Sequence, residues 1–358
     1  MKKGLLILAI ISVVSSCTKF DDKLYDTKDS NILYPPYTEL RDLIDDAGWW
    51  YWAQEVSSDE IVFPVRGTDW NDGGKWKVLH THEWTNDVDA VNSMWSQIDD
   101  GIRESNKVLD ELSPKAGDPI IDKSIAKTKT LRAFFMYLMM DNFGDIPLVT
   151  SFSNAPGFPE KVSRSEIYDF LIEDLTASAS LLPVSTNKFA VSRGMAYTLL
   201  AKLYINAEVY TGTANYAKAE AMCDSVIGLG IYSLDNTVTA PFAANNVNVP
   251  ENIFTIVFDE VEAQGFRLHM RTLHYLSDAT FGMAVGPWNG FAAVEDHYNS
   301  YDEEDKRKKE WFMVGQQFNK AGTKLFDQTA GEDLILTPNI PALVMGASQT
   351  SAEIRMSG

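Results

Sequence analysis

Two short segments of this sequence join tryptophan to asparagine and glycine. Trp70 and Trp76 flank the run Asn71-Asp72-Gly73-Gly74-Lys75, and Trp288 stands beside Asn289 after Gly286-Pro287. Such loops present flat apolar faces beside hydrogen-bonding side chains, which are what the C–H faces and hydroxyl edges of a sugar ring require. Core packing is the alternative role for each tryptophan. We predict that the ligand contacts come from Trp70, Asn71, Trp76, Trp288 and Asn289.

The sequence contains no recognisable catalytic motif, since a nucleophile elbow, a phosphate-binding loop and a Cys/His pair are all absent. Carboxylates such as Asp59 and Asp69 are too common in an acidic chain to mark a catalytic pair. His80 and His82 would share one face of a strand, but no third ligand follows at a recognisable spacing. We therefore predict no catalytic residue, no bound metal and no cofactor.

An excess of acidic residues limits the partners of this chain. Its 358 residues include 31 Lys and Arg but 50 Asp and Glu, which gives a formal net charge of −19. Such a surface repels phosphate backbones, so we predict no binding to nucleic acid. Hydrophobic residues make up 45% of the chain, enough for one large or two modest packed domains.

The first seventeen residues are typical of an exported lipoprotein. Lys2-Lys3 precedes an apolar run from Leu5 to Val14, which is too short to cross about 30 Å of hydrocarbon. The cysteine after Ser15-Ser16 then matches the pattern at which bacteria attach lipid to a thiol and cleave before it. We predict a signal peptide over 1–16 and a membrane anchor through lipid on Cys17. An ordinary secretory signal with an incidental cysteine is the alternative.

Helical periodicity dominates the chain from about residue 91 to residue 228. Ser163 and Glu166 have the spacing of a capping box at the start of one helix. Small residues one turn apart follow in Ala196–Ala207 and again in Tyr216–Val226, as in the helix pairs of tetratricopeptide repeats. A plain helical bundle is the alternative. Cys223, within the second segment, is expected to be a buried small side chain.

Two regions depart from the helical pattern, and loops of this kind commonly carry function on a rigid scaffold. One is rich in Trp, Gly and Asp; the other has Gly/Pro/Asn-rich loops around the apolar run Ile253–Phe258, which predicts a buried strand. We predict a mostly α fold, a tetratricopeptide-like helix-pair scaffold with long irregular loops and a few short strands. The predicted units are a tether over 17–36, a helical domain over 37–229 with a Trp-rich loop over 49–84, and a loop-rich region over 230–358.

Short stretches from residue 17 to residue 307 carry a family resemblance. They are Cys17, Ser58–Glu60, Gly67–Gly74, Trp95–Ile102 with Asn106, Arg132–Phe135, Asp141–Leu148, Leu199–Tyr204, Glu251–Phe254, Trp288–Phe291 and Asp305–Arg307. In this order they resemble the SusD/RagB family of outer-membrane nutrient-binding lipoproteins in Bacteroidetes.

This resemblance implies a non-catalytic receptor on the outer face of the outer membrane, held there by lipid on Cys17. It implies delivery of oligosaccharides or polysaccharide to a SusC-like TonB-dependent transporter. The alternatives are a peptide-binding receptor of the RagB type, a surface glycosidase, and a scaffold that recognises only the transporter. Members of this family continue beyond Gly358, so we also expect this chain to be truncated at its C-terminus and to lack the last helix pairs.

Overall fold

A computed structural model describes residues 34–338 apart from 46, 47, 68, 260 and 262. The predicted signal peptide, the lipidation site at Cys17 and nearly all of the predicted tether lie outside the described residues. The described part of the chain holds no helix with the length and apolar character needed to cross a membrane.

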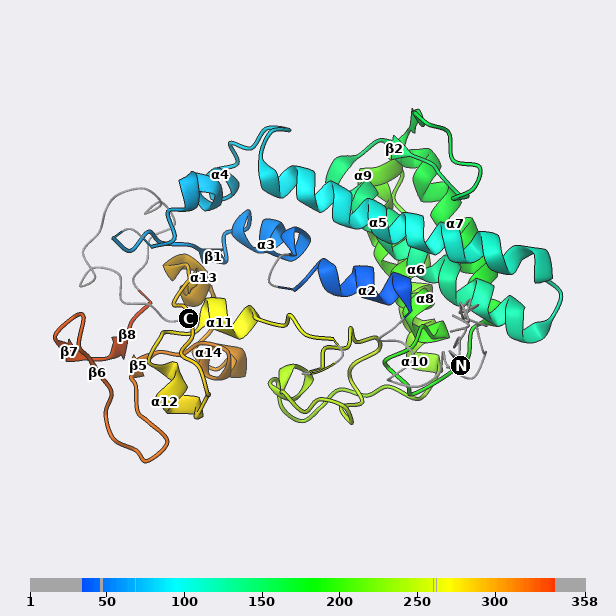
Figure 1. Cartoon of the computed structure of the whole chain (residues 1–358). Coiled ribbons are helices and arrows are strands. Elements are labelled where there is room, and N and C mark those ends of the chain that lie inside the picture. Colours follow the sequence, from blue (N-terminus) through cyan, green and yellow to red (C-terminus); the bar gives the residue numbers. More distant parts are fainter. Residues whose placement is uncertain (1–33, 46–47, 68, 260, 262, 339–358) are drawn as a thin grey trace, which may run out of the picture.

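Three long helices form the centre of a helical layer (Figure 1). Helix α5 packs on α6, and α6 packs on α7. Gly101 of α5 permits the first contact, because a Cβ there would lie 2.3 Å from the ring of Phe135 in α6. The three helices are α5 (Asp89–Leu112), α6 (Pro119–Phe143) and α7 (Arg164–Leu181).

The predicted capping box at the start of α7 is confirmed. The backbone N–H of Glu166 donates to Ser163 Oγ at 3.2 Å, and the backbone N–H of Ser163 donates to Glu166 Oε2 at 3.1 Å. Each side chain thus satisfies a backbone donor that the first helical turn leaves without a partner in the helix.

A buried ion pair joins the three long helices. Arg132 of α6 donates through Nη2 to Asp174 Oδ2 of α7 at 2.7 Å, and Lys129 Nζ donates to Asp174 Oδ1 at 2.7 Å. Arg132 Nη1 also donates to Asn106 Oδ1 of α5 at 3.0 Å and to the Thr150 carbonyl at 3.2 Å. Because Arg132 and Asp174 are only 4% and 7% exposed, each charge depends on the other for compensation.

The predicted helix pair is present as α8 (Arg193–Ile205) and α10 (Tyr216–Gly228), with the short α9 (Ala207–Thr211) between them. Helix α8 packs on both α7 and α10. The prediction that Cys223 is buried is wrong. Helix α10 packs chiefly on α8 and buries only Ala219, so the thiol of Cys223 faces outward and is exposed.

The Trp-rich segment is partly helical, not a continuous loop. It contains α3 (Trp49–Val56) and α4 (Lys75–His80), which pack on each other. Helix α3 also packs on α5, as does the preceding α2 (Pro35–Asp42). Trp52 and Val56 of α3 are buried, as is Trp76 of α4. This segment therefore builds a second hydrophobic core beside the helical layer.

The described residues after 229 form short helices, loops and two-residue strands. Figure 1 shows α11 to α14 at the end of the molecule where α3 lies, away from α7 and α10. The short helices are α11 (Leu268–Thr272), α12 (Ser277–Phe281), α13 (Glu295–Ser300) and α14 (Lys306–Glu310), with single 3-10 turns η1 (Asp72–Gly74), η2 (Ser113–Lys115) and η3 (Ala240–Phe242) elsewhere in the chain.

Four antiparallel pairs of very short strands complete the described fold. The pair of β1 with β4 is the one that joins the Trp-rich segment to the C-terminal region, with Ile61 opposite Ala293 and Val62 opposite Ala292. The pairs are β1 (Ile61–Val62) with β4 (Ala292–Ala293), β2 (Ile146–Pro147) with β3 (Lys161–Val162), β5 (Gly315–Gln316) with β8 (Ile335–Leu336), and β6 (Phe326–Asp327) with β7 (Glu332–Asp333).

The prediction of a buried strand over Ile253–Phe258 is wrong. The segment has no ladder partner, and its residues are mostly half-buried. The Thr255 N–H donates to the Lys188 carbonyl at 2.8 Å, and the Phe254 ring lies 6.1 Å from that of Tyr37. The apolar run therefore packs on the helical layer as an extended segment. The wider prediction of a mostly helical fold with irregular loops and a few short strands is confirmed.

Removing the buried carboxylate should destabilise the helical layer strongly. We expect Asp174→Ala to lower the free energy of unfolding by about 3–5 kcal/mol, because the Arg132 guanidinium stays buried without its counter-charge. Asp169→Ala, which removes an exposed carboxylate from the same helix, should change it by less than about 0.5 kcal/mol. Denaturant unfolding measures both, and equal effects of the two substitutions would contradict this role for the ion pair.

Ionisation of Glu39 in α2, near the acidic residues of α5, should make the free energy of unfolding depend on pH. Burial, reinforced by the charges of Asp42, Asp100 and Glu104, raises the pKa of Glu39 from 4.5 to about 7. Between these two pH values the folded state retains a proton on Glu39 that the unfolded chain releases. The free energy of unfolding therefore decreases as pH rises from about 4.5 to about 7.

We expect Glu39→Gln to stabilise the chain at pH 8 by about 1 kcal/mol, a value reduced for partial exposure, and to have little effect at pH 4. Thermal unfolding at both pH values measures this difference. Glu111→Gln makes the same change of charge at an exposed position of α5 and serves as the control. A stabilisation by Glu39→Gln that is the same at both pH values would contradict the prediction.

Candidate ligand-binding site

The two Trp-Asn segments singled out in the sequence meet in the structure. The indole Nε1 of Trp70 donates to the backbone carbonyl of Trp288 at 3.2 Å, across a sequence separation of 218 residues. The pairing of β1 with β4 explains this contact, because it aligns the residues after Val62 with those before Ala292.

Backbone hydrogen bonds hold the 288–291 segment against the end of α11. The N–H groups of Trp288 and Asn289 donate to the carbonyls of Met270 and Leu273, at 2.6 and 3.0 Å. The next two N–H groups along the segment both donate to the Arg271 carbonyl, at 2.9 and 2.6 Å. The last carbonyls of a helix have no partner within the helix, so this segment satisfies them.

Gly290 allows this segment to approach the aromatic rings beneath it. A Cβ at this position would lie 2.7 Å from the Arg271 carbonyl oxygen, 2.8 Å from the Phe63 ring and 3.0 Å from the Trp70 ring. Its own carbonyl accepts a hydrogen bond from Arg66 Nη1 at 3.0 Å. Burial lowers the pKa of Arg66 to about 9.

Stacked aromatic rings form the floor of the site. Trp70 stacks on Phe63 with ring centroids 4.9 Å apart, and Trp52 stacks on Phe291 at 4.5 Å. Trp52, Phe63 and Phe291 are each 2% exposed or less, whereas Trp70 is half-buried and Trp288 is 36% exposed. The ring surface open to a ligand therefore belongs to Trp70 and Trp288.

The prediction of a ligand contact from Trp76 is wrong on grounds of burial. The Trp76 side chain is 2% exposed, and its ring centroid lies 4.0 Å from that of Phe63. Its Nε1 donates to Asp72 Oδ2 at 2.8 Å, and this hydrogen bond holds the Asn71–Lys75 loop in place. The role of Trp76 is support of the loop, and Asn71 at the top of this loop is exposed.

Arg271 was not predicted from the sequence, yet it lies among the tryptophans. Its Cζ is 5.1 Å from the ring centroid of Trp52, 5.8 Å from that of Trp70 and 5.7 Å from that of Trp288. A guanidinium within about 6 Å of an indole face is attracted by the ring quadrupole. No local motif marks this arginine, because Trp52 and Trp70 come from segments about two hundred residues away in the sequence.

Two residues of the site adopt a backbone conformation that non-glycine residues rarely use. Trp70 has φ 62° and Asn289 has φ 53°. Left-handed φ values cost free energy at such residues, and the cost is highest for a bulky side chain such as tryptophan. Strain of this kind persists where the surrounding structure fixes it and is concentrated at binding sites.

The structure gives no support to a strand that aligns His80 with His82. His80 ends helix α4, and His82 Nε2 lies 2.7 Å from the Ser57 carbonyl oxygen. Within the described residues, no group of three or more His, Cys, Asp or Glu side chains is arranged to hold a metal ion.

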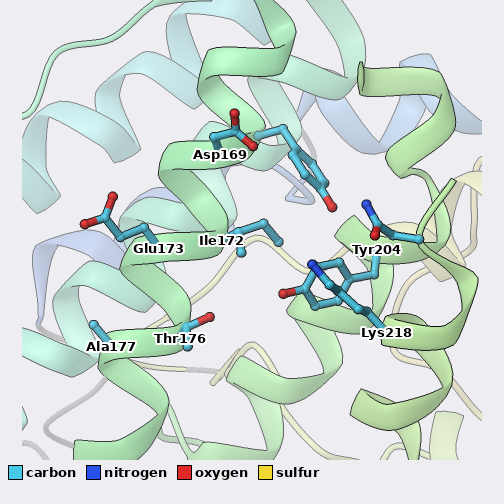
Figure 2. Close-up of a pocket in the computed structure, with 9 residues that line it drawn as sticks. Asp169, Ile172, Glu173, Thr176, Ala177, Tyr204 and Lys218 are labelled. Carbon is cyan, nitrogen blue, oxygen red and sulfur yellow. The ribbon is translucent and has the colours of Figure 1, made fainter. Parts of the chain in front are cut away.

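A separate concavity lies between α7 and the α8–α10 pair. Asp169, Ile172, Glu173 and Thr176 of α7 line it, and Figure 2 shows Ile172 and Thr176 on the side of α7 toward Tyr204 and Lys218. Its volume is about 590 Å³, and the Lys218 ammonium lies 5.4 Å from the centre of the Tyr204 ring. No tryptophan lines this concavity, and α7 lies at the opposite end of the molecule from α11 (Figure 1).

Comparison with known proteins shows which family and which fold this chain is similar to. A SusD-like family described as "Starch-binding associating with outer membrane" matches residues 51–205. The starch-binding protein SusD of Bacteroides thetaiotaomicron is 26% identical over 196 residues, which are 54% of this chain and 34% of that protein. A SusD superfamily protein of Parabacteroides distasonis, 18% identical, superposes with a TM-score of 0.70 over 92% of this chain and 72% of the other. Residues 51–205 are thus similar to a SusD-like family, and the chain shares the fold of a SusD superfamily protein.

Other solved structures share this SusD fold at low sequence identity. Surface glycan-binding protein A of B. thetaiotaomicron, solved in complex with laminarihexaose, is 18% identical, with a TM-score of 0.64 over 79% of this chain and 62% of the other. The neighbours confirm the predicted fold class. The alignment with the curated SusD covers about a third of that protein's length.

A side chain at position 290 should disturb the aromatic floor of the candidate site directly. We expect Gly290→Ala to lower the free energy of unfolding by about 1–3 kcal/mol, because the new methyl group meets a fixed backbone carbonyl and two rings. We also expect weaker near-ultraviolet circular dichroism as the stacked rings separate. Gly157→Ala is the control, since a Cβ there meets no atom within 4 Å. Unchanged stability and spectrum in Gly290→Ala would contradict the proposed packing.

Proposed function

We propose that this chain is a non-catalytic receptor that binds oligosaccharide or polysaccharide through Trp70 and Trp288. The observation that carries the proposal is the meeting of these two partly exposed indoles across 218 residues, through the Trp70 Nε1 contact with the Trp288 carbonyl. Indole faces pack on the C–H surfaces of sugar rings. The family description as starch-binding supports the same ligand class.

Hydrogen-bonding groups stand at the edge of the ring surface. Asn71 is exposed beside Trp70, and Asn289 is half-buried beside Trp288. A side-chain amide both donates and accepts hydrogen bonds, as does a sugar hydroxyl. The predicted contacts of Trp70, Asn71, Trp288 and Asn289 are therefore retained in the proposal, while Trp76 supports the loop.

The proposal extends to the location and the partner of the chain. The N-terminal pattern ending in Cys17 supports attachment to the outer membrane through lipid, with the receptor facing the cell exterior. The family description as associating with the outer membrane agrees with this location. We propose that the bound glycan passes to a SusC-like TonB-dependent transporter.

Binding to a panel of polysaccharides tests the ligand-binding proposal. We expect Trp70→Ala and Trp288→Ala each to weaken binding about tenfold or more, since each removes an aromatic face worth about 1.4 kcal/mol. Isothermal titration calorimetry of the purified chain measures the affinities. Trp84→Ala is the matched control, because Trp84 is 43% exposed and packs only beside His82 among the aromatic rings of the described residues.

Three outcomes would overturn parts of this function. Glycan binding that survives both substitutions would remove Trp70 and Trp288 from the site but leave the receptor role. Binding of peptides but of no glycan would show a peptide-binding receptor of the RagB type instead of a glycan receptor. Release of reducing ends from a bound polysaccharide would show a glycosidase.

A further inference from the structure

A second pair of exposed aromatic rings joins two segments that are far apart in the sequence. Phe242 is 73% exposed, and Trp311 is 42% exposed. Their ring centroids lie 5.6 Å apart in a T-shaped arrangement. Phe242 is the last residue of η3, and Trp311 directly follows α14. Adjoining apolar rings on a surface mark a site of interaction more often than single exposed side chains do.

The indole of Trp311 is held in the same way as the indole of Trp70. Its Nε1 donates to the backbone carbonyl of Val238 at 3.1 Å, across a sequence separation of 73 residues. The contact of Trp70 Nε1 with the Trp288 carbonyl has the same form. In both places a main-chain oxygen fixes an indole that stays partly exposed, so the ring is oriented before any ligand arrives.

Amide side chains follow Phe242 along the same loop. Asn245 and Asn248 are exposed, and Asn246 is half-buried. The Nδ2 of Asn246 donates to the Pro241 carbonyl at 2.9 Å, which ties the loop back to the residue before Phe242. An aromatic face close to amides that donate and accept hydrogen bonds is also the combination that carries the first candidate site.

Phe242 also forms one wall of a concavity between this loop and α8. The volume of the concavity is about 380 Å³, which is in the range of small-molecule sites. Leu199 and Phe254 are among its apolar lining residues, and Lys202 and Glu251 are among its polar ones. A sugar ring has the same division into apolar faces and polar edges, so the concavity can accept one beside Phe242.

Charged side chains next to the two rings favour a sugar over a protein as the ligand. Lys202 and Glu251 line the concavity, and the Cζ of Arg307 lies 5.8 Å from the ring centroid of Trp311. Arg307 is itself paired with Asp305, whose Oδ2 lies 2.6 Å from its Nη2. The centres of protein interfaces are depleted in charged residues, whereas charged groups form good hydrogen bonds with sugar hydroxyls.

We propose that Phe242 and Trp311 form a second glycan-binding surface, which shares no residue with the site of Trp70 and Trp288. This proposal rests on the receptor function proposed above, because a glycan is the ligand of both surfaces. A polysaccharide that contacts the chain at two surfaces is bound more tightly than at either one alone. A short oligosaccharide occupies each surface separately, so the two can be observed independently.

Fluorine NMR of the purified chain, labelled with 5-fluorotryptophan, observes each surface at its own tryptophan. Trp311→Phe, Trp70→Phe and Trp288→Phe assign the three signals. The probes are maltohexaose, laminarihexaose, xylohexaose, mannohexaose and the hexamer of any other polysaccharide of the panel that binds. We expect at least one of them to shift the Trp311 signal as well as those of Trp70 and Trp288, because a sugar on an indole face changes the surroundings of the ring.

Phe242→Ala should weaken the binding seen at Trp311 about tenfold, because it removes the neighbouring ring face. The hexamer concentration that half-saturates the Trp70 and Trp288 signals should not change. Phe242→Tyr should keep the binding at Trp311, since the aromatic ring remains. Leu234→Ala is the control, because it removes a side chain that is 84% exposed and apolar but carries no ring.

The outcomes separate this proposal from the receptor function. A hexamer that shifts the Trp70 and Trp288 signals but not the Trp311 signal would overturn the second surface and leave the receptor in place. A Trp311 shift with an unchanged midpoint in Phe242→Ala would overturn it as well. Self-association in sedimentation velocity that Phe242→Ala abolishes would assign the two rings to contact with a second copy of this chain. Failure of every polysaccharide and every hexamer to bind would overturn the receptor function itself.

Discussion

The buried pair of Arg132 and Asp174 is the interaction on which the rest of this structure depends. It joins α6 to α7, and the second arm of the guanidinium reaches Asn106 of α5. Neither charge can be left alone in the interior, so these three helices have one favourable arrangement. Helix α5 then supports α3, which supplies the buried Trp52 ring that stacks on Phe291. The position of the aromatic floor thus follows from a charge pair in the helical layer.

The site itself is organised mainly by backbone groups. The 288–291 segment is fixed by hydrogen bonds from its N–H groups to the carbonyls at the end of α11. Its distance from the rings is set by the absence of a side chain at Gly290. The side chains of Trp288 and Asn289 therefore do not need to hold the segment in place and remain available to a ligand. Helix α11 also supplies Arg271, so one short helix positions both the segment and the charge.

Local sequence patterns predicted what local interactions determine. The capping box of Ser163 and Glu166 joins residues three apart in the chain, so their spacing in the sequence is enough to predict it. Cys223 and Ile253–Phe258 were misjudged because burial and strand pairing depend on neighbours that local periodicity does not specify. Residue type singled out Trp70 and Trp288, but it could not distinguish them from Trp76, whose ring faces Phe63. Local patterns do not predict Arg271 as a site residue, because two of its tryptophan neighbours, Trp52 and Trp70, come from segments some two hundred residues away.

The contact between Trp70 and Trp288 has an evolutionary consequence. The indole of Trp70 donates to a main-chain oxygen, which every amino acid would present at position 288. Mutation there can exchange the surface offered to a ligand without breaking the link between the two segments. Position 290 does not tolerate such substitution, because any side chain there would meet the Arg271 carbonyl and the Phe63 ring. Substitutions at position 288 can therefore change the exposed surface of this segment, one side chain at a time, while the contact with Trp70 and the architecture persist.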